Sequence, residues 1–139
     1  MSEIRFEQSI WQNFQLQEVL IENSLFSSGA WDQFLIENSH LTNLGFAGFA
    51  FVEARIQFTD LSQITIEQSR LHRSAWASLQ GGRVHFRNSL IEECSFLDLD
   101  IEEIVFENCR ILASELESAQ KPQLRNCLIQ KSPGFESGA

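Results

Sequence analysis

Side chains that could carry out catalysis or bind a metal are few in this chain, and their spacing assembles no familiar centre. The three cysteines, Cys94, Cys109 and Cys127, form no Cys-x-x-Cys pair and have no histidine at the spacing of a zinc site. An odd number of cysteines argues against a disulfide framework. Small thiols are more often packed in a core than reactive. We therefore expect three structural cysteines and no metal centre.

The histidines and carboxylates give equally little support to an enzyme. His40, His72 and His85 have no Ser, Cys or carboxylate pair at the spacing of a catalytic triad. Asp60 and Asp100 are the pair that acid–base catalysis could use, but without a pocket they are ordinary solvated charge. The sequence therefore predicts a non-enzymatic protein with no cofactor. A carbohydrate-active β-helix enzyme is a minor alternative.

The chain is organised by an apolar residue at every fifth position. From Phe6 to Leu116 every fifth residue is large and apolar, and Gly81 is the single exception. A second, uncharged column lies two residues before each of these positions and includes small residues such as Ser69 and Cys94. Two inward positions separated by an outward one are typical of a β-strand, whereas a helix spaces apolar residues three and four apart. Each unit of five is expected to be a short extended side followed by a polar corner.

A chain that turns a corner this often must wind into a solenoid. Three of its units resemble the repeats of the pentapeptide-repeat family, in which a small residue and an Asp or Asn precede a central Leu or Phe: Cys94-Ser95-Phe96-Leu97-Asp98, Thr59-Asp60-Leu61-Ser62-Gln63 and Ser69-Arg70-Leu71-His72-Arg73. The resemblance covers residues 4 to 118. The chain departs from the family before the central residue, where Asp occurs only at Asp60 and Asp100.

The resemblance implies an all-β fold, a right-handed quadrilateral parallel β-helix of about 5–6 coils with a short C-terminal capping segment. A recurrence of 20 residues, which places Phe26, Phe46 and Phe86 on one side, supports the four sides independently. We expect residues 1–118 to form the β-helix and residues 119–139 to form the cap, with a disordered tail from Ser132. Gly81 is expected to leave a local bulge or bend.

The bulk composition excludes several functional classes. The chain of 139 residues is long enough for one domain. Its net charge of −9 argues against direct binding to DNA, RNA or an anionic membrane. No apolar run is long enough to span a membrane, and the first residues lack a signal-peptide pattern. We expect a cytoplasmic bacterial protein, although export by a specialised secretion system would leave no trace in these residues.

Two outward surfaces are candidates for binding a partner. A clustered apolar patch is typical of an interface, and the third side of the predicted coil carries such a cluster: Leu35, Phe58, Ala75, Ala77 and Leu97. The second surface is acidic and lies in the C-terminal half: Asp98, Asp100, Glu102, Glu103, Glu115 and Glu117. Further apolar residues are also predicted to face outward: Ile10, Leu20, Leu25, Val52, Leu90, Val105 and Leu112.

The favoured function is a protein-interaction module, a rigid acidic rod that docks an unidentified partner protein or a second copy of itself. The resemblance also implies an alternative, because the quinolone-resistance members of the family are acidic rods that resemble a DNA duplex and inhibit gyrase. The acidic C-terminal half is similar in kind. Two features argue against it: no dimerising C-terminal helix is legible, and the middle of the chain is basic, with Arg55, Arg70, Arg73, Arg83 and Arg87. A secreted bacterial effector is a further minor alternative.

Overall fold

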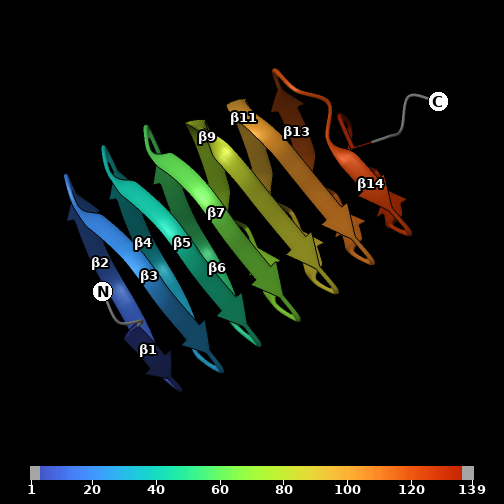
Figure 1. Cartoon of the computed structure of the whole chain (residues 1–139). Helices are drawn as coiled ribbons and strands as arrows, with labels where there is room; N and C mark the ends of the chain where they lie inside the picture. Colours follow the sequence, from blue (N-terminus) through green and yellow to red (C-terminus); the bar gives the residue numbers. More distant parts are fainter. Residues whose placement is uncertain (1–3, 136–139) are drawn as a thin grey trace.

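The computed structural model describes residues 4–135, which wind into a parallel β-solenoid of about six turns in which no helix occurs (Figure 1). Its strands are β1 (Ile4–Glu7), β2 (Ile10–Gln17), β3 (Leu20–Ser27), β4 (Ala30–Glu37), β5 (His40–Ala47), β6 (Ala50–Gln57), β7 (Asp60–Glu67), β8 (Arg70–His72), β9 (Ala75–Arg87), β10 (Leu90–Glu92), β11 (Ser95–Glu107), β12 (Arg110–Leu112), β13 (Glu115–Ser118), β14 (Gln123–Arg125) and β15 (Leu128–Gln130). The predicted all-β solenoid is confirmed.

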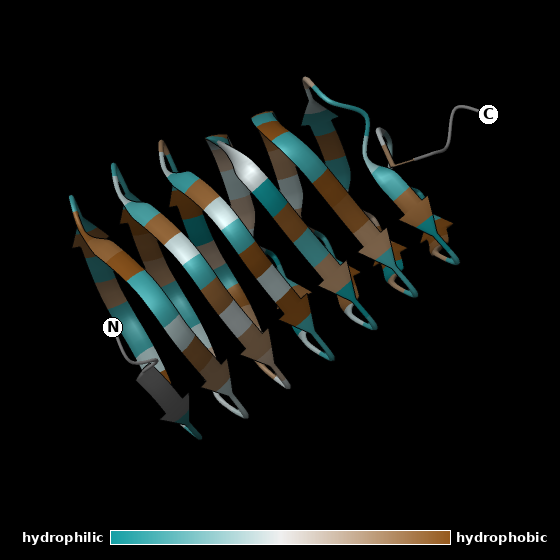
Figure 2. Cartoon of the chain, viewed as in Figure 1, coloured by the Kyte–Doolittle hydropathy of each residue, from teal (hydrophilic) through white to brown (hydrophobic). Residues whose placement is uncertain are grey.

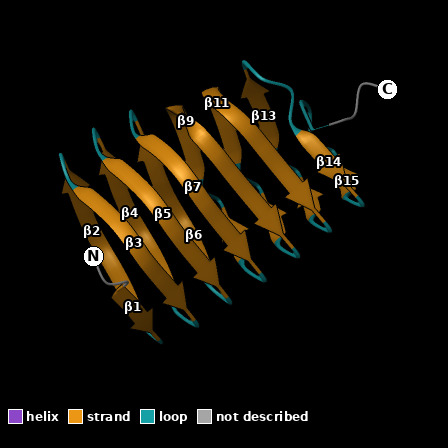
Figure 3. Ribbon diagram, in the orientation of Figure 1, coloured by secondary structure: helices purple, strands orange, loops and turns teal. Residues whose placement is uncertain are grey.

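Every strand pair is parallel and joins one turn of the coil to the next. On one face β3, β5 and β7 stack in order, so that Phe26 lies beside Phe46. On the opposite face β2, β4 and β6 stack in the same way, and Ile36 lies beside Ile56. The turns between strands lie at the rims of the coil (Figure 3). Because the register is constant, residues 20 positions apart form straight columns along the axis.

The corners of the coil are made by residues in the left-handed region. Corner residues such as Asn43, Gln63 and Glu53 have φ angles of 56°, 57° and 50°. Asn and other polar residues enter this region more readily than β-branched ones, whose side chains clash there. No Val, Ile or Thr occupies a positive-φ corner in the part of the chain that is described. The polar residues that follow each inward apolar residue therefore turn the chain every five residues.

The inward columns fill the axis of the coil with apolar side chains. Figure 2 shows the hydrophobic residues as brown bands along the strands. Trp31 and Phe51, both predicted to face inward, are each 1% exposed. Rings in adjacent turns stack face to face, as for Phe26 and Phe46, whose centroids are 4.9 Å apart at 10°. Such columns bury each ring on both sides, and burying an aromatic side chain stabilises the fold by a few kcal/mol, about 1.5–3.

Gly81 interrupts the inward column because two turns approach each other closely there. A Cβ atom at Gly81 would collide with the carbonyl oxygen of Leu61, and the residue has a φ of 153°. Strand β9 runs through this point without a break and pairs in register with β7 and β11. The glycine therefore permits a close backbone contact within a continuous strand.

The C-terminal end of the coil is closed by the chain itself. After β13, the strands β14 and β15 continue the ladder with a shorter step, since Val105 pairs with Gln123 and Arg110 with Leu128. Phe135 is fully buried against the last turn. The expected disorder from Ser132 is therefore wrong for Ser132 to Phe135, because Phe135 is buried and the Ser132 hydroxyl donates to the Gln130 carbonyl; the rest of that tail, 136–139, lies outside the described residues.

One outward apolar residue differs from its predicted exposure. Val105 is only 2% exposed, although it lies outside the core cluster. In its outward column it pairs with His85 in the turn before and with Gln123 in the turn after. By contrast, Ile10 and Leu20 are exposed, as predicted.

Within residues 4–135 no helix is long and apolar enough to cross a membrane.

Candidate functional site: an apolar edge with flanking carboxylates

A surface depression with a volume of about 1050 Å³ lies over β3, β5, β7, β9 and β11. Its floor is made of small residues that follow one another in adjacent turns, among them Thr42, Ser62 and Gly82. Arg83 and His85 stand at its margin. The depression exists because the outward side chains in the middle of this face are smaller than their neighbours, which leaves a shallow trough.

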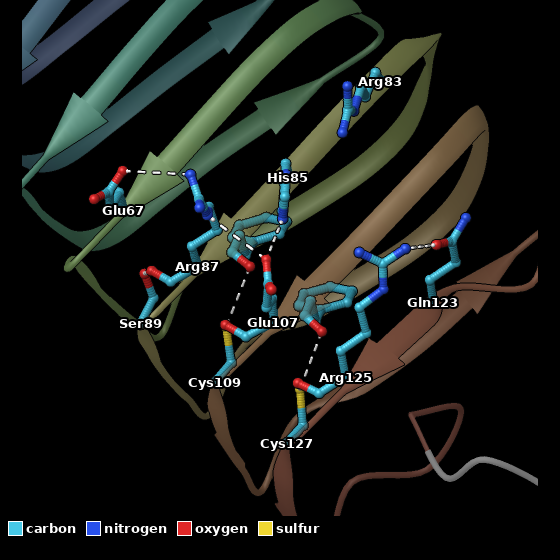
Figure 4. Close-up of polar contacts among 12 residues, drawn as sticks. Glu67, Arg83, His85, Arg87, Ser89, Glu107, Cys109, Gln123, Arg125 and Cys127 are labelled. Atoms are coloured by element: carbon cyan, nitrogen blue, oxygen red, sulfur yellow. Dashed lines mark hydrogen bonds and ion pairs between the residues drawn. The ribbon is translucent and has the colours of Figure 1, made fainter.

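The charges around this trough are paired with one another (Figure 4). Arg83 Nε lies 2.9 Å from a carboxylate oxygen of Glu103 in the next turn. Arg87 lies 3.9 Å from Glu67 and 3.6 Å from Glu107, so that it bridges two turns. His85 Nε2 lies 3.2 Å from the same Glu107 oxygen. These contacts run along the coil and leave little net charge to attract a ligand.

A second groove, of about 520 Å³, follows the corner at which β4 and β6 end and β5 and β7 begin. Phe58 lies in its wall and is 58% exposed. Ala77 and Leu97 lie in the neighbouring column, where Ala77 pairs with Gln57 and Leu97 pairs with Ala77. Ala77 is half-buried and Leu97 is 36% exposed. Three of the five residues of the predicted apolar surface therefore lie beside the same corner.

Phe58 also occupies an unfavourable backbone conformation. It is the corner residue of its turn, with a φ of 50°. A large aromatic residue in the left-handed region costs about 1 kcal/mol relative to an extended conformation, and Asn or Gly is preferred there. Asn38 occupies the equivalent corner one turn earlier. A residue that is both strained and exposed contributes little to stability, which favours a role in binding.

Carboxylates border the apolar residues on one flank. Asp60, Asp98 and Asp100 line the same groove as Phe58. Asp98 accepts a hydrogen bond of 3.0 Å from the Ser78 hydroxyl. Asp60 lies 3.6 Å from His40 Nδ1. None of the three carboxylates has an arginine or lysine partner in the described part of the chain, so their negative charge is presented to solvent. We call these residues, with Phe58, Ala77 and Leu97, the Phe58 edge.

The remaining predicted surface residues lie away from this edge. Leu35 and Ala75 share a column in which Arg55 stands between them, so the apolar surface is divided there. The acidic surface is divided as well. Glu103 pairs with Arg83, and Glu115 accepts a hydrogen bond of 3.2 Å from Ser95. Two other carboxylates, Glu102 and Glu117, are exposed on other sides of the coil.

No cluster of three or more His, Cys, Asp or Glu side chains that could hold a metal occurs in residues 4–135. Each histidine is near one carboxylate, as His72 Nδ1 is to Glu92 at 3.7 Å, and this arrangement supplies neither a nucleophile nor a metal site. Burial raises the pKa of the Cys94 thiol to about 11, which leaves it protonated and unreactive at neutral pH.

The geometry of one turn decides the fold. Each turn has four sides, each side supplies two inward residues, and left-handed corner residues recur every five positions along most of the coil. The chain has the pentapeptide-repeat fold. Its corner at Arg83 and Glu103 differs from the others, because neither of these residues has a positive φ.

Comparison with solved structures finds pentapeptide-repeat proteins at low sequence identity. The protein Rfr23 from the cyanobacterium Cyanothece 51142 aligns over 91% of both chains with 9% identity and a TM-score of 0.42. QnrB1, a plasmid-mediated fluoroquinolone resistance protein, aligns over 93% of this chain and 85% of its own, with 12% identity and a TM-score of 0.38. A Parabacteroides merdae protein provisionally named a glycosyl hydrolase aligns over 91% and 81%, with 9% identity and a TM-score of 0.37.

The comparisons with protein families and with curated proteins give no match. The assignment of this pentapeptide-repeat fold therefore depends on the coil itself.

The sequence predicted the outward apolar residues Phe58, Ala77 and Leu97 but not the trough on the adjoining β5–β7 face. The trough comes from three small outward residues at the same position of successive turns, Thr42, Ser62 and Gly82. A search of the outward columns for side-chain size, at intervals of one turn, would have revealed it. Sequence reasoning also missed that Cys109 and Cys127 lie in adjacent turns, because the shortened last turn changes the interval between them.

Proposed function

We propose that this protein is a non-enzymatic interaction module that docks a partner protein through the Phe58 edge. The exposed and strained Phe58 is the observation that supports this proposal most strongly. An aromatic residue held on a rigid scaffold loses little conformational entropy on binding and is a common anchor of interfaces. The parallel ladders on both sides of the corner provide that scaffold.

The chemistry of the edge specifies the kind of partner. An apolar pocket or side chain of the partner would receive Phe58 and Leu97, which excludes water from the centre of the contact. Basic residues of the partner would face Asp60, Asp98 and Asp100, whose charge is presented to solvent. Such charges at the rim of an interface increase the rate of association and make it sensitive to salt.

The experiment compares variants of the edge with a matched control in a pull-down from the native host. Phe58→Asp is expected to abolish capture of the specific partner. Asp98→Asn combined with Asp100→Asn is expected to weaken it and reduce its salt dependence. Ile10→Asp is the control, since Ile10 is an equally exposed apolar residue, 67%, on another side of the coil. Equal capture by all variants would contradict the proposal.

Self-association through the same edge is tested by light scattering after size-exclusion chromatography. A dimer that Phe58→Asp converts to a monomer would identify the partner as a second copy of the chain. A wild-type monomer would exclude this form of the proposal and leave a different protein as the partner.

The DNA-mimic alternative receives less support from the arrangement of charges. A mimic of duplex DNA needs a continuous row of uncompensated carboxylates. In this coil several acids in the C-terminal half are neutralised by arginines one turn away, as in Arg73–Glu93 at 3.8 Å and Arg83–Glu103 at 2.9 Å. We expect purified gyrase to supercoil DNA normally in the presence of this protein. Inhibition at low salt that fades as salt increases would instead favour the mimic.

A further inference from the structure

The column that contains Cys109 and Cys127 is built from hydrogen-bonding side chains. In the turns before it, the backbone N–H of Phe49 donates to the Ser69 hydroxyl at 3.1 Å, and that of Ser69 donates to the Ser89 hydroxyl at 3.2 Å. Each hydroxyl donates in turn to the carbonyl two residues earlier, as Ser89 does to Arg87 at 2.8 Å. The column therefore satisfies one buried N–H at each turn.

Cysteines replace serine in the last two turns of this column (Figure 4). Cys109 Sγ donates to the Phe86 carbonyl at 3.5 Å, and Cys127 Sγ donates to the Phe106 carbonyl at 3.2 Å, so both thiols lean toward the preceding turn. The Leu128 N–H donates to the Cys109 carbonyl at 2.9 Å. The two cysteines are thus direct neighbours across adjacent turns.

The distance between neighbouring turns suits a disulfide. Parallel strands lie about 4.8 Å apart, and the Cα atoms of disulfide-bonded cysteines are usually about 4.4–6.8 Å apart. Cys109 and Cys127 immediately precede the paired residues Arg110 and Leu128, so their backbones are neighbours at this spacing.

We propose that Cys109 and Cys127 form a reversible disulfide that fastens the last turn of the coil to the turn before it. The oxidant is a low-molecular-weight disulfide. The half-buried Cys127 attacks first as a thiolate and forms a mixed disulfide, releasing one small thiol. Cys109 then attacks the Cys127 sulfur and releases the second small thiol. Overall two protein thiols are oxidised to one disulfide, and one small disulfide is reduced to two thiols.

The environments of the two sulfurs match these roles. The hydrogen bond from Cys109 lowers the pKa of Cys127 well below its usual value, which increases the thiolate fraction at the more accessible sulfur. The same hydrogen bond and burial raise the pKa of Cys109, so it stays protonated until the mixed disulfide has formed. Cys94, by contrast, is buried beside Ser114 with no cysteine in an adjacent turn.

The disulfide would act on a part of the coil that has short strands with few pairing partners. Strands β14 and β15 have only three residues each, and each pairs with one neighbouring strand. Their turn depends on few ladder hydrogen bonds, so it is expected to open more easily than the rest of the coil. A covalent link at Cys109 and Cys127 would hold this turn closed under oxidising conditions and release it under reducing ones.

Oxidised glutathione added to the reduced protein tests the proposal, with intact-mass and peptide mass spectrometry as the readout. Wild type and the control Cys94→Ser are expected to lose two hydrogen atoms and to yield a peptide pair linked through Cys109 and Cys127. Cys109→Ser should instead keep one glutathione on Cys127, and Cys127→Ser should not react. Serine suits both positions because it occupies the same column in earlier turns.

Hydrogen exchange distinguishes a disulfide that holds the last turn closed from a thiol that is merely reactive. We expect exchange in β14 and β15 to slow by tenfold or more when wild type is oxidised, and to be unchanged in Cys109→Ser under the same treatment. A stable glutathione adduct on wild-type Cys127, a linked pair that involves Cys94, or no reaction at all would each overturn the proposal. A Cys109–Cys127 disulfide without slower exchange in β14 and β15 would overturn the proposal that the bond holds the last turn closed.

Discussion

The ring of Phe135 lies edge-on to the ring of Phe106, with centroids 5.1 Å apart at 79°. This contact closes the apolar axis of the coil at its C-terminal end, where the core would otherwise meet water. The ring of Phe96 also lies edge-on to the ring of Phe135, with centroids 5.8 Å apart at 81°. The two contacts explain why the chain returns over its last turn instead of extending into solvent, since burial of an aromatic side chain favours the closed end.

We predict that Phe135→Ala destabilises the protein by about 3–5 kcal/mol if the whole coil unfolds as one unit, because the substitution removes a fully buried aromatic side chain. If the last turn opens separately, the loss appears as faster hydrogen exchange confined to β14 and β15. Chemical denaturation and hydrogen exchange together distinguish the two. Phe135→Leu is the control and should retain most of the stability. If Phe135→Ala had the same unfolding free energy and the same hydrogen exchange as wild type, the capping role would be contradicted.

Gly81→Ala and Gly82→Ala are adjacent substitutions with opposite expected results. At Gly81 a Cβ atom would collide with the Leu61 backbone, so we expect a loss of at least about 3 kcal/mol or failure to fold. At Gly82 the nearest atom in that direction is the Ser62 hydroxyl oxygen at 3.8 Å, which is an ordinary contact. Gly82→Ala should therefore change the unfolding free energy by less than about 1 kcal/mol. Similar losses in both variants, measured by denaturant titration, would refute the close contact between the turns.

The pH dependence of stability should contain a contribution from Cys94. Burial raises its pKa from about 9 when unfolded to about 11 in the folded protein. Between these values the unfolded state loses the proton first, so folding stability falls as the pH rises through this window and is unaffected below it. The loss approaches about 3 kcal/mol above pH 11. Cys94→Ser should remove this part of the alkaline slope while keeping the hydrogen bonds of its column. An identical slope in both proteins would exclude the contribution.

Phe58→Asn should separate stability from binding. Asparagine adopts the left-handed corner conformation more easily than phenylalanine, so we expect the folded protein to gain about 0.5–1 kcal/mol. The same substitution removes the proposed anchor and should weaken partner binding by tenfold or more. A variant that is less stable than wild type would show that Phe58 has a structural role, and unchanged binding would exclude it as the anchor.

The sequence predicted the solenoid because its period is a local property that every turn repeats. Inward positions such as Trp31 and Leu71 could be identified directly, since strand alternation determines which side chains face the axis. The outward exposure of Phe58 and Leu97 followed from the same count. These predictions needed no knowledge of contacts between distant residues.

Features that depend on neighbouring turns could not be read in this way. Val105 is buried by side chains in the turns before and after it, not by its own position in the repeat. The contact between Cys109 and Cys127 requires the register of a shortened turn, which the interruption after Ser118 obscures. The position of Phe135 depends on a turn from Ser132 to Phe135 that the five-residue period does not encode.

The docking proposal is tested most directly by a photo-crosslinking amino acid placed at position 58 in the native host. We predict a specific crosslink to one protein, lost when Asp98 and Asp100 are both changed to Asn, and no such crosslink from position 10, which is similarly exposed. The same crosslinked products from both positions, or none from position 58 while the protein is folded and expressed, would contradict the account.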